Sequence, residues 1–254
     1  MQKFFRMFLW KFYKKEIKND GTLSVEECVE KIVEYVLPVR DSVYRDVRYW
    51  NQYYSKNSAM PLGNESKFAR DILPKISDKG TSLIEFGCGN GRDSLFFAEK
   101  GLDVTGVDAS GNAIEMLKER NTFPNARFLC EDFTGESVIF KVQHDYCYCR
   151  FTLHAIAEMQ EQYALRNARD TLKTGGMLFI EARSIKDDIC GLGKCIGENS
   201  YIYNDHFRRF IDKDKLVNNL ESGGFGIASE QEGRGFAPYG EEDPVVIRII
   251  ARKE

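Results

Sequence analysis

The sequence has little of several features that would direct it to other classes of protein. No apolar stretch is long enough to cross a bilayer, so we expect no membrane-spanning helix. The formal net charge of −3 provides no broad basic field, so we expect no nucleic-acid partner. The seven cysteines show no repeated C-x-x-C spacing, which predicts reduced thiols in a cytoplasmic protein and no metal site. The 254 residues suit one domain with an extension.

The N-terminal segment has the most unusual composition. Residues 1–18 interleave basic side chains with aromatic and large aliphatic ones, a pattern typical of an amphipathic helix at a membrane surface or on a partner. A helix that packs on its own domain or on a neighbouring subunit is the alternative. Residues 24–37 carry an apolar stripe behind a capping-box pattern, and this second helix could pack on the domain or pair between subunits. We therefore predict a helical extension over 1–40 and a main domain over 41–254.

Residues 83–93 carry the strongest signal in the chain. A buried strand ends in a turn with glycine at positions 87, 89 and 91, and a helical pattern begins at Arg92. About twenty residues later a second strand ends at Asp108. In an α/β sheet this pairing is typical of a site for an adenosine-containing cofactor. The glycines allow close backbone approach, and the acid accepts hydrogen bonds from the ribose hydroxyls.

The glycine spacing and one acid distinguish between such cofactors. A dinucleotide site needs G-x-G-x-x-G with a pyrophosphate at the helix N-terminus, whereas this turn reads Gly87-x-Gly89-x-Gly91. Glu85 lies two residues before the first glycine, and its carboxylate would repel a pyrophosphate. The same carboxylate suits a ligand with an ammonium and a sulfonium group, and S-adenosylmethionine carries both.

The motif E-x-G-x-G-x-G after a strand, with Asp108 on the next, resembles the class I S-adenosylmethionine-dependent methyltransferases. The resemblance covers residues 45–254 and implies an α/β, Rossmann-like fold. Its sheet has seven strands, mostly parallel with the last antiparallel, and helices on both faces. The implied cofactor is S-adenosyl-L-methionine. The residues expected to hold it lie at strand ends and in the preceding helix: Glu85, Gly87, Cys88, Gly89, Gly91, Asp108, Ala109, Asp132, Phe133, Arg150 and Tyr54.

Three residues are candidates for the chemistry. Methyl transfer from a sulfonium is an in-line displacement, so the enzyme aligns the reacting atoms and removes a proton where the nucleophile holds one. His154 lies just past the strand that ends near Arg150, where the resemblance places the methyl group. His206 lies in a long insert. We expect His154, His206 and Arg150 to be catalytic, and the alternative for each of these histidines is a structural role. His144 is expected at the surface.

The insert over 183–211 is too long for an ordinary connection and is expected to cap the active site. Four of its side chains form the predicted substrate-binding set: Arg183, His206, Arg208 and Arg209. Arginine forks suit phosphate and carboxylate, so these residues predict a cradle for an anionic substrate. The alternative is a solvated loop whose charges pair with Asp187, Asp188 and Asp205.

Several segments, among them Trp50–Tyr54 and 205–210, together resemble bacterial methyltransferases of capsule and O-antigen synthesis. That resemblance implies O-methylation of an anionic sugar or phosphate-bearing precursor of a cell-surface polysaccharide, near the inner face of the membrane. One alternative is a methyltransferase for a free metabolite or a toxic oxyanion or thiol. Another is a non-catalytic subunit that binds the cofactor. The aromatic residues at 50, 53 and 54 are expected as a lid over the cofactor or as ordinary core.

Overall fold

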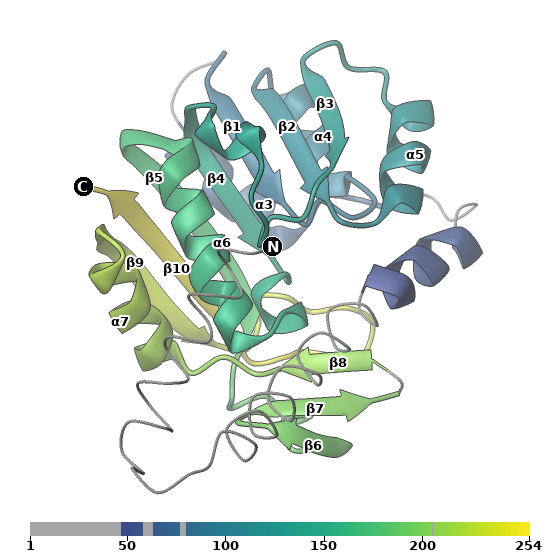
Figure 1. Cartoon of the computed structure of the whole chain (residues 1–254), viewed down its shortest axis with the longest axis vertical. Coiled ribbons are helices and arrows are strands. Elements are labelled where there is room, and N and C mark those ends of the chain that lie inside the picture. The colour runs from purple at the N-terminus through teal and green to yellow at the C-terminus, as the bar shows by residue number, and fades with distance from the viewer. Residues whose placement is uncertain (1–46, 58–62, 77–79, 205) are drawn as a thin grey trace, which may run out of the picture. The chain divides into compact units, whose positions relative to one another are not determined.

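The computed structural model describes residues 47–57, 63–76, 80–204 and 206–254 (Figure 1). The helices predicted at 1–18 and 24–37, with their membrane, partner and oligomer contacts, lie outside the described residues, as do the boundary at residue 40 and Asp205. Within the described ranges, no helix is both long and apolar enough to cross a membrane.

A seven-stranded sheet forms the body of the fold, with strand order β3-β2-β1-β4-β5-β10-β9. Its first five members pair in parallel, and β10 runs antiparallel between β5 and β9. The strands are β1 (Ser82–Phe86), β2 (Asp103–Asp108), β3 (Ala126–Cys130), β4 (His144–Arg150), β5 (Leu172–Arg183), β9 (Phe225–Gly233) and β10 (Val246–Lys253). The predicted methyltransferase sheet, mostly parallel with an antiparallel last strand, is confirmed.

Helices cover both faces of this sheet (Figure 1). The longer ones are α3 (Lys67–Ile72), α4 (Arg92–Glu99), α5 (Gly111–Arg120), α6 (Glu158–Thr171) and α7 (Lys213–Ser222). Apolar residues of α6 and α7 pack in one core cluster, and those of α3, α4 and α5 pack in the other. Short 3-10 turns follow at Leu73–Lys75, Val138–Lys141 and Leu153–Ala155.

The central strand β4 shows why this sequence suits a sheet that is buried on both faces. Its side chains alternate, so Tyr146 and Tyr148 enter one core cluster while Cys147 and Cys149 enter the other. His144 at its start is only 2% exposed, and its Nδ1 lies 2.9 Å from the Thr171 hydroxyl. The expected surface position of His144 is therefore wrong, because the strand begins inside the layer covered by α6.

The insert between β5 and α7 forms a small antiparallel sheet of its own. Its strands are β6 (Lys194–Gly197), β7 (Ser200–Tyr203) and β8 (His206–Arg209), in the order β6-β7-β8. A bridge between Ser184 and Ile211 ties the insert back to the end of β5. The small sheet lies beyond the carboxyl ends of the parallel strands, where open α/β sheets bind their ligands (Figure 1).

Candidate active site

The glycine turn after β1 packs tightly against its own protein. Gly87, Gly89 and Gly91 all have positive φ, at 67°, 54° and 76°. A Cβ on Gly91 would lie 2.3 Å from Leu117 Cδ2, and one on Gly89 would lie 2.3 Å from the Tyr54 hydroxyl. These glycines are therefore required by the close contact with α5 and with the helix over residues 47–56, as well as by the backbone conformation.

Asp108, at the tip of β2, is held in place by backbone donors. Its two carboxylate oxygens accept the N–H groups of Gly89 at 2.9 Å and of Ser110 at 2.8 Å. Burial raises the pKa of Asp108, and the two backbone hydrogen bonds oppose that shift. The carboxylate thus lies directly beside the glycine turn with a fixed orientation.

Glu85 lies beneath the turn. It is 4% exposed and accepts a hydrogen bond from the hydroxyl of Ser94 in α4. Burial, followed by the nearby Asp93, raises the pKa of the Glu85 carboxyl. Asp93 in turn accepts the Tyr148 hydroxyl at 2.8 Å and is bound by Ser66. This polar network anchors α4 to the sheet, a role for which the sequence offered no signal.

Asp132 and Phe133 follow β3, next to the end of β2. Asp132 Oδ1 accepts both the N–H and the hydroxyl of Thr134, at 2.8 and 2.7 Å, which fixes the carboxylate at the start of a tight turn. The Phe133 ring is buried and stacks on Phe86 with the ring centroids 5.6 Å apart. Only the backbone of Phe133 is therefore available to a ligand, as the resemblance implies for this position.

The helix over residues 47–56 crosses the ends of the strands. Asn51 Oδ1 accepts the Ser110 hydroxyl at 2.8 Å, and Asn112 Nδ2 donates to the Asn51 carbonyl at 2.9 Å. These bonds hold the helix to the start of α5. Burial, followed by Asp108, raises the pKa of Tyr54, so its hydroxyl above Gly89 stays protonated. Sequence reasoning missed Asn51, whose only signal was an asparagine among the aromatic residues.

Arg150 ends β4 on the other side of the turn. Its Nε donates to Glu181 Oε1 at 2.8 Å, and its guanidinium lies 4.3 Å from the centroid of the Phe151 ring. Phe151 has φ of 56°, an unusual conformation for an aromatic residue, and its N–H donates to the Glu181 carbonyl at 2.8 Å. The Arg150 side chain is 15% exposed, and its terminal nitrogens are not among the buried donors of the described residues that lack a partner.

His154 follows at the start of the next turn and is 7% exposed. The Arg183 N–H donates to His154 Nδ1 at 3.4 Å, a long bond that nevertheless assigns the proton of the neutral ring to Nε2. Burial, followed by the charges of Arg183 and Arg208, holds the pKa of His154 well below its usual range. The ring is therefore neutral, and its Nε2 is a donor rather than a base in this tautomer.

His206 belongs to β8 of the small sheet, and its ring packs against the helix over residues 47–56. Its ring stacks on Tyr49 with centroids 4.4 Å apart and meets the edge of Trp50 at 5.2 Å. Burial, followed by Arg208, lowers the pKa of His206 to about 4. The residue is 5% exposed, and its Nδ1 is buried without a hydrogen-bond partner among the described residues.

Arg183 and Arg208 complete a cationic cluster around His154. Arg183 donates to Asp187 at 3.1 Å and to Glu242 at 3.2 Å, so part of the predicted pairing within the insert does occur. Burial, followed by Arg183, lowers the pKa of Arg208. The Nε of Arg208 is buried and has no hydrogen-bond partner within the described ranges. Asp187 and Glu242 therefore face both arginines, and Arg208 Nε is the donor of this pair that remains without a partner among the described residues.

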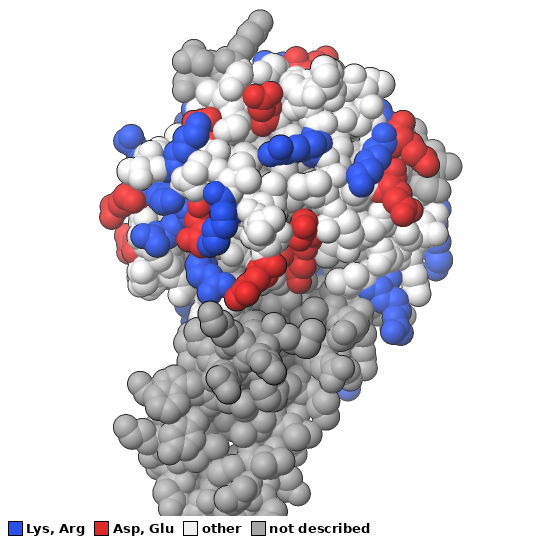
Figure 2. All heavy atoms as spheres, turned by 45° about the horizontal axis from the view of Figure 1, so that its top comes forward, with Lys and Arg blue, Asp and Glu red and all other residues white. Residues whose placement is uncertain are grey.

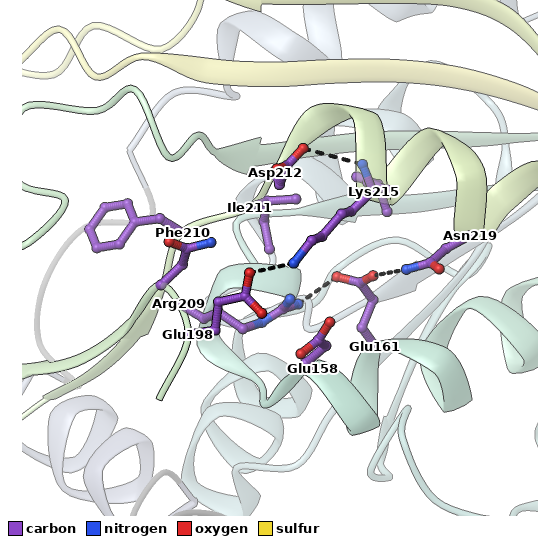
Figure 3. Close-up of a pocket in the computed structure, with 11 residues that line it drawn as sticks. Glu158, Glu161, Glu198, Arg209, Phe210, Ile211, Asp212, Lys215 and Asn219 are labelled. Carbon is purple, nitrogen blue, oxygen red and sulfur yellow. Dashed lines mark hydrogen bonds and ion pairs between the residues drawn. The ribbon is translucent and has the colours of Figure 1, made fainter. Parts of the chain in front are cut away.

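Arg209 was predicted beside Arg208, but the structure places its side chain elsewhere. It donates to the carbonyls of Ile156 and Leu153 at 2.9 and 3.1 Å and pairs with Glu161 at 2.5 Å. Neighbouring residues of a strand point to opposite faces, which separates Arg209 from Arg208. Arg209 instead lines a shallow hollow between α6 and α7, where Glu161 binds both Arg209 and Asn219 (Figure 3).

Comparison with known proteins agrees with this geometry. A family described as a methyltransferase domain matches residues 83–176, which contain the glycine turn, Asp108, Asp132 and Arg150. The chain is a class I S-adenosylmethionine-dependent methyltransferase. The enzyme is similar to the tRNA N(3)-methylcytidine methyltransferase of Schizosaccharomyces pombe, with 26% identity over 80% of this chain and 72% of that protein. It is also 31% identical to the tRNA N(3)-methylcytidine methyltransferase Mettl2 of Drosophila melanogaster over 62% of this chain and 54% of that protein.

The solved structures agree on the fold. The methyltransferase superposes on the 1,6-didemethyltoxoflavin-N1-methyltransferase of Burkholderia thailandensis with a TM-score of 0.63, over 85% of this chain and 90% of that one, at 16% identity. That structure holds S-adenosylhomocysteine and a small heterocyclic substrate. The enzyme therefore shares its fold with a methyltransferase for a small molecule.

These comparisons correct two expectations. The prediction that the methyltransferase has no nucleic-acid partner is wrong as an exclusion, because the two relatives named above both act on tRNA. A small negative net charge describes the whole chain and does not exclude a local site for RNA. None of the relatives named above is an enzyme of capsule or O-antigen synthesis, so they give that finer resemblance no support.

The residues of the methyltransferase fit its cofactor, S-adenosyl-L-methionine. The Asp108 carboxylate uses one lone pair of each oxygen on the backbone, and the second remains for the ribose hydroxyls. Asp132 lies just past the end of the neighbouring strand β3, and the three glycines of the turn after β1 offer only backbone to a ligand. When bound, the cofactor supplies an electrophilic methyl group and a positive sulfonium. Asp108 and Asp132, both fixed by hydrogen bonds, would contribute negative charge that suits this cation.

Proposed function

We propose that the enzyme methylates an acceptor that carries an anionic group, a phosphate foremost. One observation carries the proposal: Arg183 donates its N–H to the buried His154 just past the end of β4, and the charges of Arg208 and Arg150 also reach that ring. A buried nitrogen without a partner costs about 1–3 kcal/mol, and Arg208 Nε and His206 Nδ1 are two such atoms among the described residues. An anion bound between the arginines would offset part of that cost.

The proposed roles follow from the contacts of each residue. Arg150 uses Nε on Glu181, which leaves its two terminal nitrogens for a bidentate contact with phosphate or carboxylate. Arg183 and Arg208 supply further charge from β5 and β8. Arg209 is left out of the proposed set, because its donors are taken by Glu161 and two carbonyls.

The two histidines are proposed to orient the acceptor. His154 presents Nε2–H to an acceptor oxygen, while the low pKa of His206 keeps that ring neutral at pH 7. A nucleophile that is already ionised, such as a phosphate oxygen, needs no base, and neither does a nitrogen with a free lone pair. In either case alignment of the reacting atoms supplies the larger part of catalysis.

Two acceptor classes fit the proposal. A small phosphate- or carboxylate-bearing molecule, such as the predicted polysaccharide precursor, would occupy the cluster beneath the insert. RNA is the second candidate, because the relatives named above methylate tRNA. On the face drawn in Figure 2, basic and acidic side chains of the described residues are interspersed and form no broad basic field. The RNA candidate therefore rests on the relatives.

The test is transfer of a radiolabelled methyl group from S-adenosylmethionine into a fractionated lysate. We expect label in a phosphate-bearing small-molecule fraction, and we expect phosphatase treatment of that fraction beforehand to abolish it. Label that disappears with ribonuclease would select the RNA candidate. Label only in neutral acceptors, with equal rates for Arg208→Ala and the wild type, would refute the anionic site. Lys194→Ala, an exposed lysine in the same small sheet, is the matched control.

A further inference from the structure

Three neighbouring strands place a row of charged side chains through the middle of the fold. Arg150 in β4, Glu181 in β5 and Arg248 in β10 are direct register partners. Register partners on adjacent strands point to the same face, so the three form a cross-strand row of alternating sign. Glu181, in the centre, is 1% exposed.

Each oxygen of the central carboxylate binds a different arginine. Glu181 Oε1 accepts Arg150 Nε at 2.8 Å, and Oε2 accepts Arg248 Nε at 2.7 Å. Burial raises the pKa of Glu181, and both guanidinium groups oppose the shift. A buried carboxylate that binds two arginines is costly to desolvate, so its presence calls for an explanation other than stability.

Arg248 is held more rigidly than an arginine that serves only as a counter-charge. Its terminal nitrogens donate to Asp71 at 2.7 Å and to the Phe236 carbonyl at 2.8 Å. Its guanidinium also lies 4.8 Å from the ring centroids of Phe68 and Phe236, between two aromatic faces. Every donor group of Arg248 thus has a partner on the protein, and the position of Glu181 is fixed from behind.

Among the described residues, Arg150 is bound at only one of its guanidinium nitrogens, whereas Arg248 is bound at all three. Only the Nε of Arg150 contacts the row, and its side chain is 15% exposed. A free arginine side chain has about 2 kcal/mol of rotamer entropy to lose on binding an anion. Holding Nε and stacking the guanidinium on Phe151 removes much of that freedom before the acceptor arrives.

We propose that Glu181 is a positioning residue for the acceptor: with Arg248 behind it, it holds the Arg150 fork in the orientation that binds the anionic group. The inference rests on the proposed function, since it requires an anion at Arg150. It goes beyond that function because Glu181 and Arg248, which do not contact the acceptor, set the orientation of the arginine that does. It also predicts that the cofactor half of the site is indifferent to Glu181.

The test uses the full chain saturated with S-adenosylhomocysteine, with inorganic phosphate as the probe and titration calorimetry as the measurement. Glu181→Gln keeps the shape but loses the charge, and we expect phosphate affinity to fall about tenfold. The affinity for S-adenosylhomocysteine should change by less than about twofold. Glu181→Asp, which retains the charge, should recover part of the loss. The control is Glu230→Gln in β9, whose carboxylate pairs with Lys213 at the surface.

The outcomes separate the two proposals. Phosphate binding that is lost in Arg208→Ala but unchanged in Glu181→Gln would overturn the positioning role and leave the anionic site standing. No phosphate binding by the wild type would overturn both. If Glu181→Gln fails to fold, Arg248→Lys tests the same inference. It keeps the charge but loses the fork that braces Glu181, and phosphate affinity should fall about threefold with the cofactor affinity unchanged.

Discussion

The two halves of the sheet's carboxyl edge differ in the charged side chains that lie at their strand ends. The half formed by β1, β2 and β3 presents Asp108 and Asp132, and the half formed by β4, β5 and the small sheet presents Arg150, Arg183 and Arg208. A cofactor with a sulfonium and an ammonium group belongs on the first half. The proposed anionic acceptor would bind at the second. Under the proposed function, this edge of the sheet would sort the two reactants by the sign of their charge and bring them together at the boundary.

The halves also differ in how their charges are held. Asp108 and Asp132 are each oriented by a donor two residues along the chain, and Asp108 also accepts the Gly89 N–H from the turn after β1. The arginines are oriented by carboxylates from other strands and loops, such as Glu181 and Glu242. Contacts close in the sequence therefore contribute more to the acidic half than to the cationic half.

The largest effect should come from the acidic half. Asp108→Asn removes the charge and turns one acceptor oxygen into a donor, so we expect affinity for S-adenosylmethionine to fall about 100-fold. Phosphate binding at the arginines should be unchanged within about twofold. Calorimetric titration of each ligand checks this, with Asp103→Asn, an exposed acid at the start of the same strand, as control. A comparable loss of phosphate affinity would show that the halves are not independent.

The reciprocal change tests the cationic half. Arg208→Ala should raise the KM for an anionic acceptor about 30-fold, because a charge-assisted contact is lost in a partly buried site. The dissociation constant of the cofactor should stay the same. Steady-state kinetics with each substrate varied in turn measures both quantities. Equal effects on the two constants would refute the division by sign.

The buried histidines of the cationic half should make stability depend on pH. The folded-state pKa of His206 is about 4, below its usual 6.5, and that of His154 is shifted in the same direction. At a pH between about 4 and 6.5 the unfolded chain binds a proton at His206 that the folded chain does not bind. The contribution of the neutral His206 to stability is thus fully present above pH 6.5 and is lost as the pH falls toward 4.

Urea denaturation measures this dependence. From pH 7 to pH 5 we expect the wild type to lose about 2 kcal/mol through His206. His206→Gln should lose less over the same range, since it cannot take up the proton. If His206→Gln showed the same pH dependence as the wild type, the pKa of His206 would not be lowered by burial against Tyr49 and by the charge of Arg208.

The smallest effect concerns the helix that spans both halves. Asn51→Ala removes the bond to the Ser110 hydroxyl, and we expect cofactor affinity to fall about threefold because the helix is less firmly held over the turn. Asn57→Ala is the control, because Asn57 lies in the turn directly after this helix and its side chain donates to the Tyr53 carbonyl of the same helix. Equal effects of the two substitutions would assign the change to helix stability alone.

Much of this arrangement could be predicted from the sequence where the signal is local. The glycine turn, the acid at the end of β2 and the alternation of strands and helices all depend on neighbours within a few residues. The class of fold and cofactor followed from them. Glu85 shows the limit: the sequence predicts that its carboxylate faces the cofactor, whereas its bond with Ser94 depends on how α4 packs and has no local signal.

The cationic half could be predicted only in part. Arg208 and Arg209 look equivalent in the sequence, and only the strand over 206–209 separates them to opposite faces. Glu181 reads as one acid in an apolar strand, because its partners lie 31 and 67 residues away. Register between strands decides which charges meet, and no local pattern specifies that register.

The opposed charges of the carboxyl edge also bear on turnover. Methyl transfer converts the sulfonium into a neutral thioether, so the acidic half attracts the spent cofactor less than the fresh one. With the proposed phosphate acceptor, methylation would likewise remove one negative charge, so the arginines would attract the product less than the acceptor. Under the proposed function, the reaction would thus cancel the charges that bring the reactants together and favour release of both products.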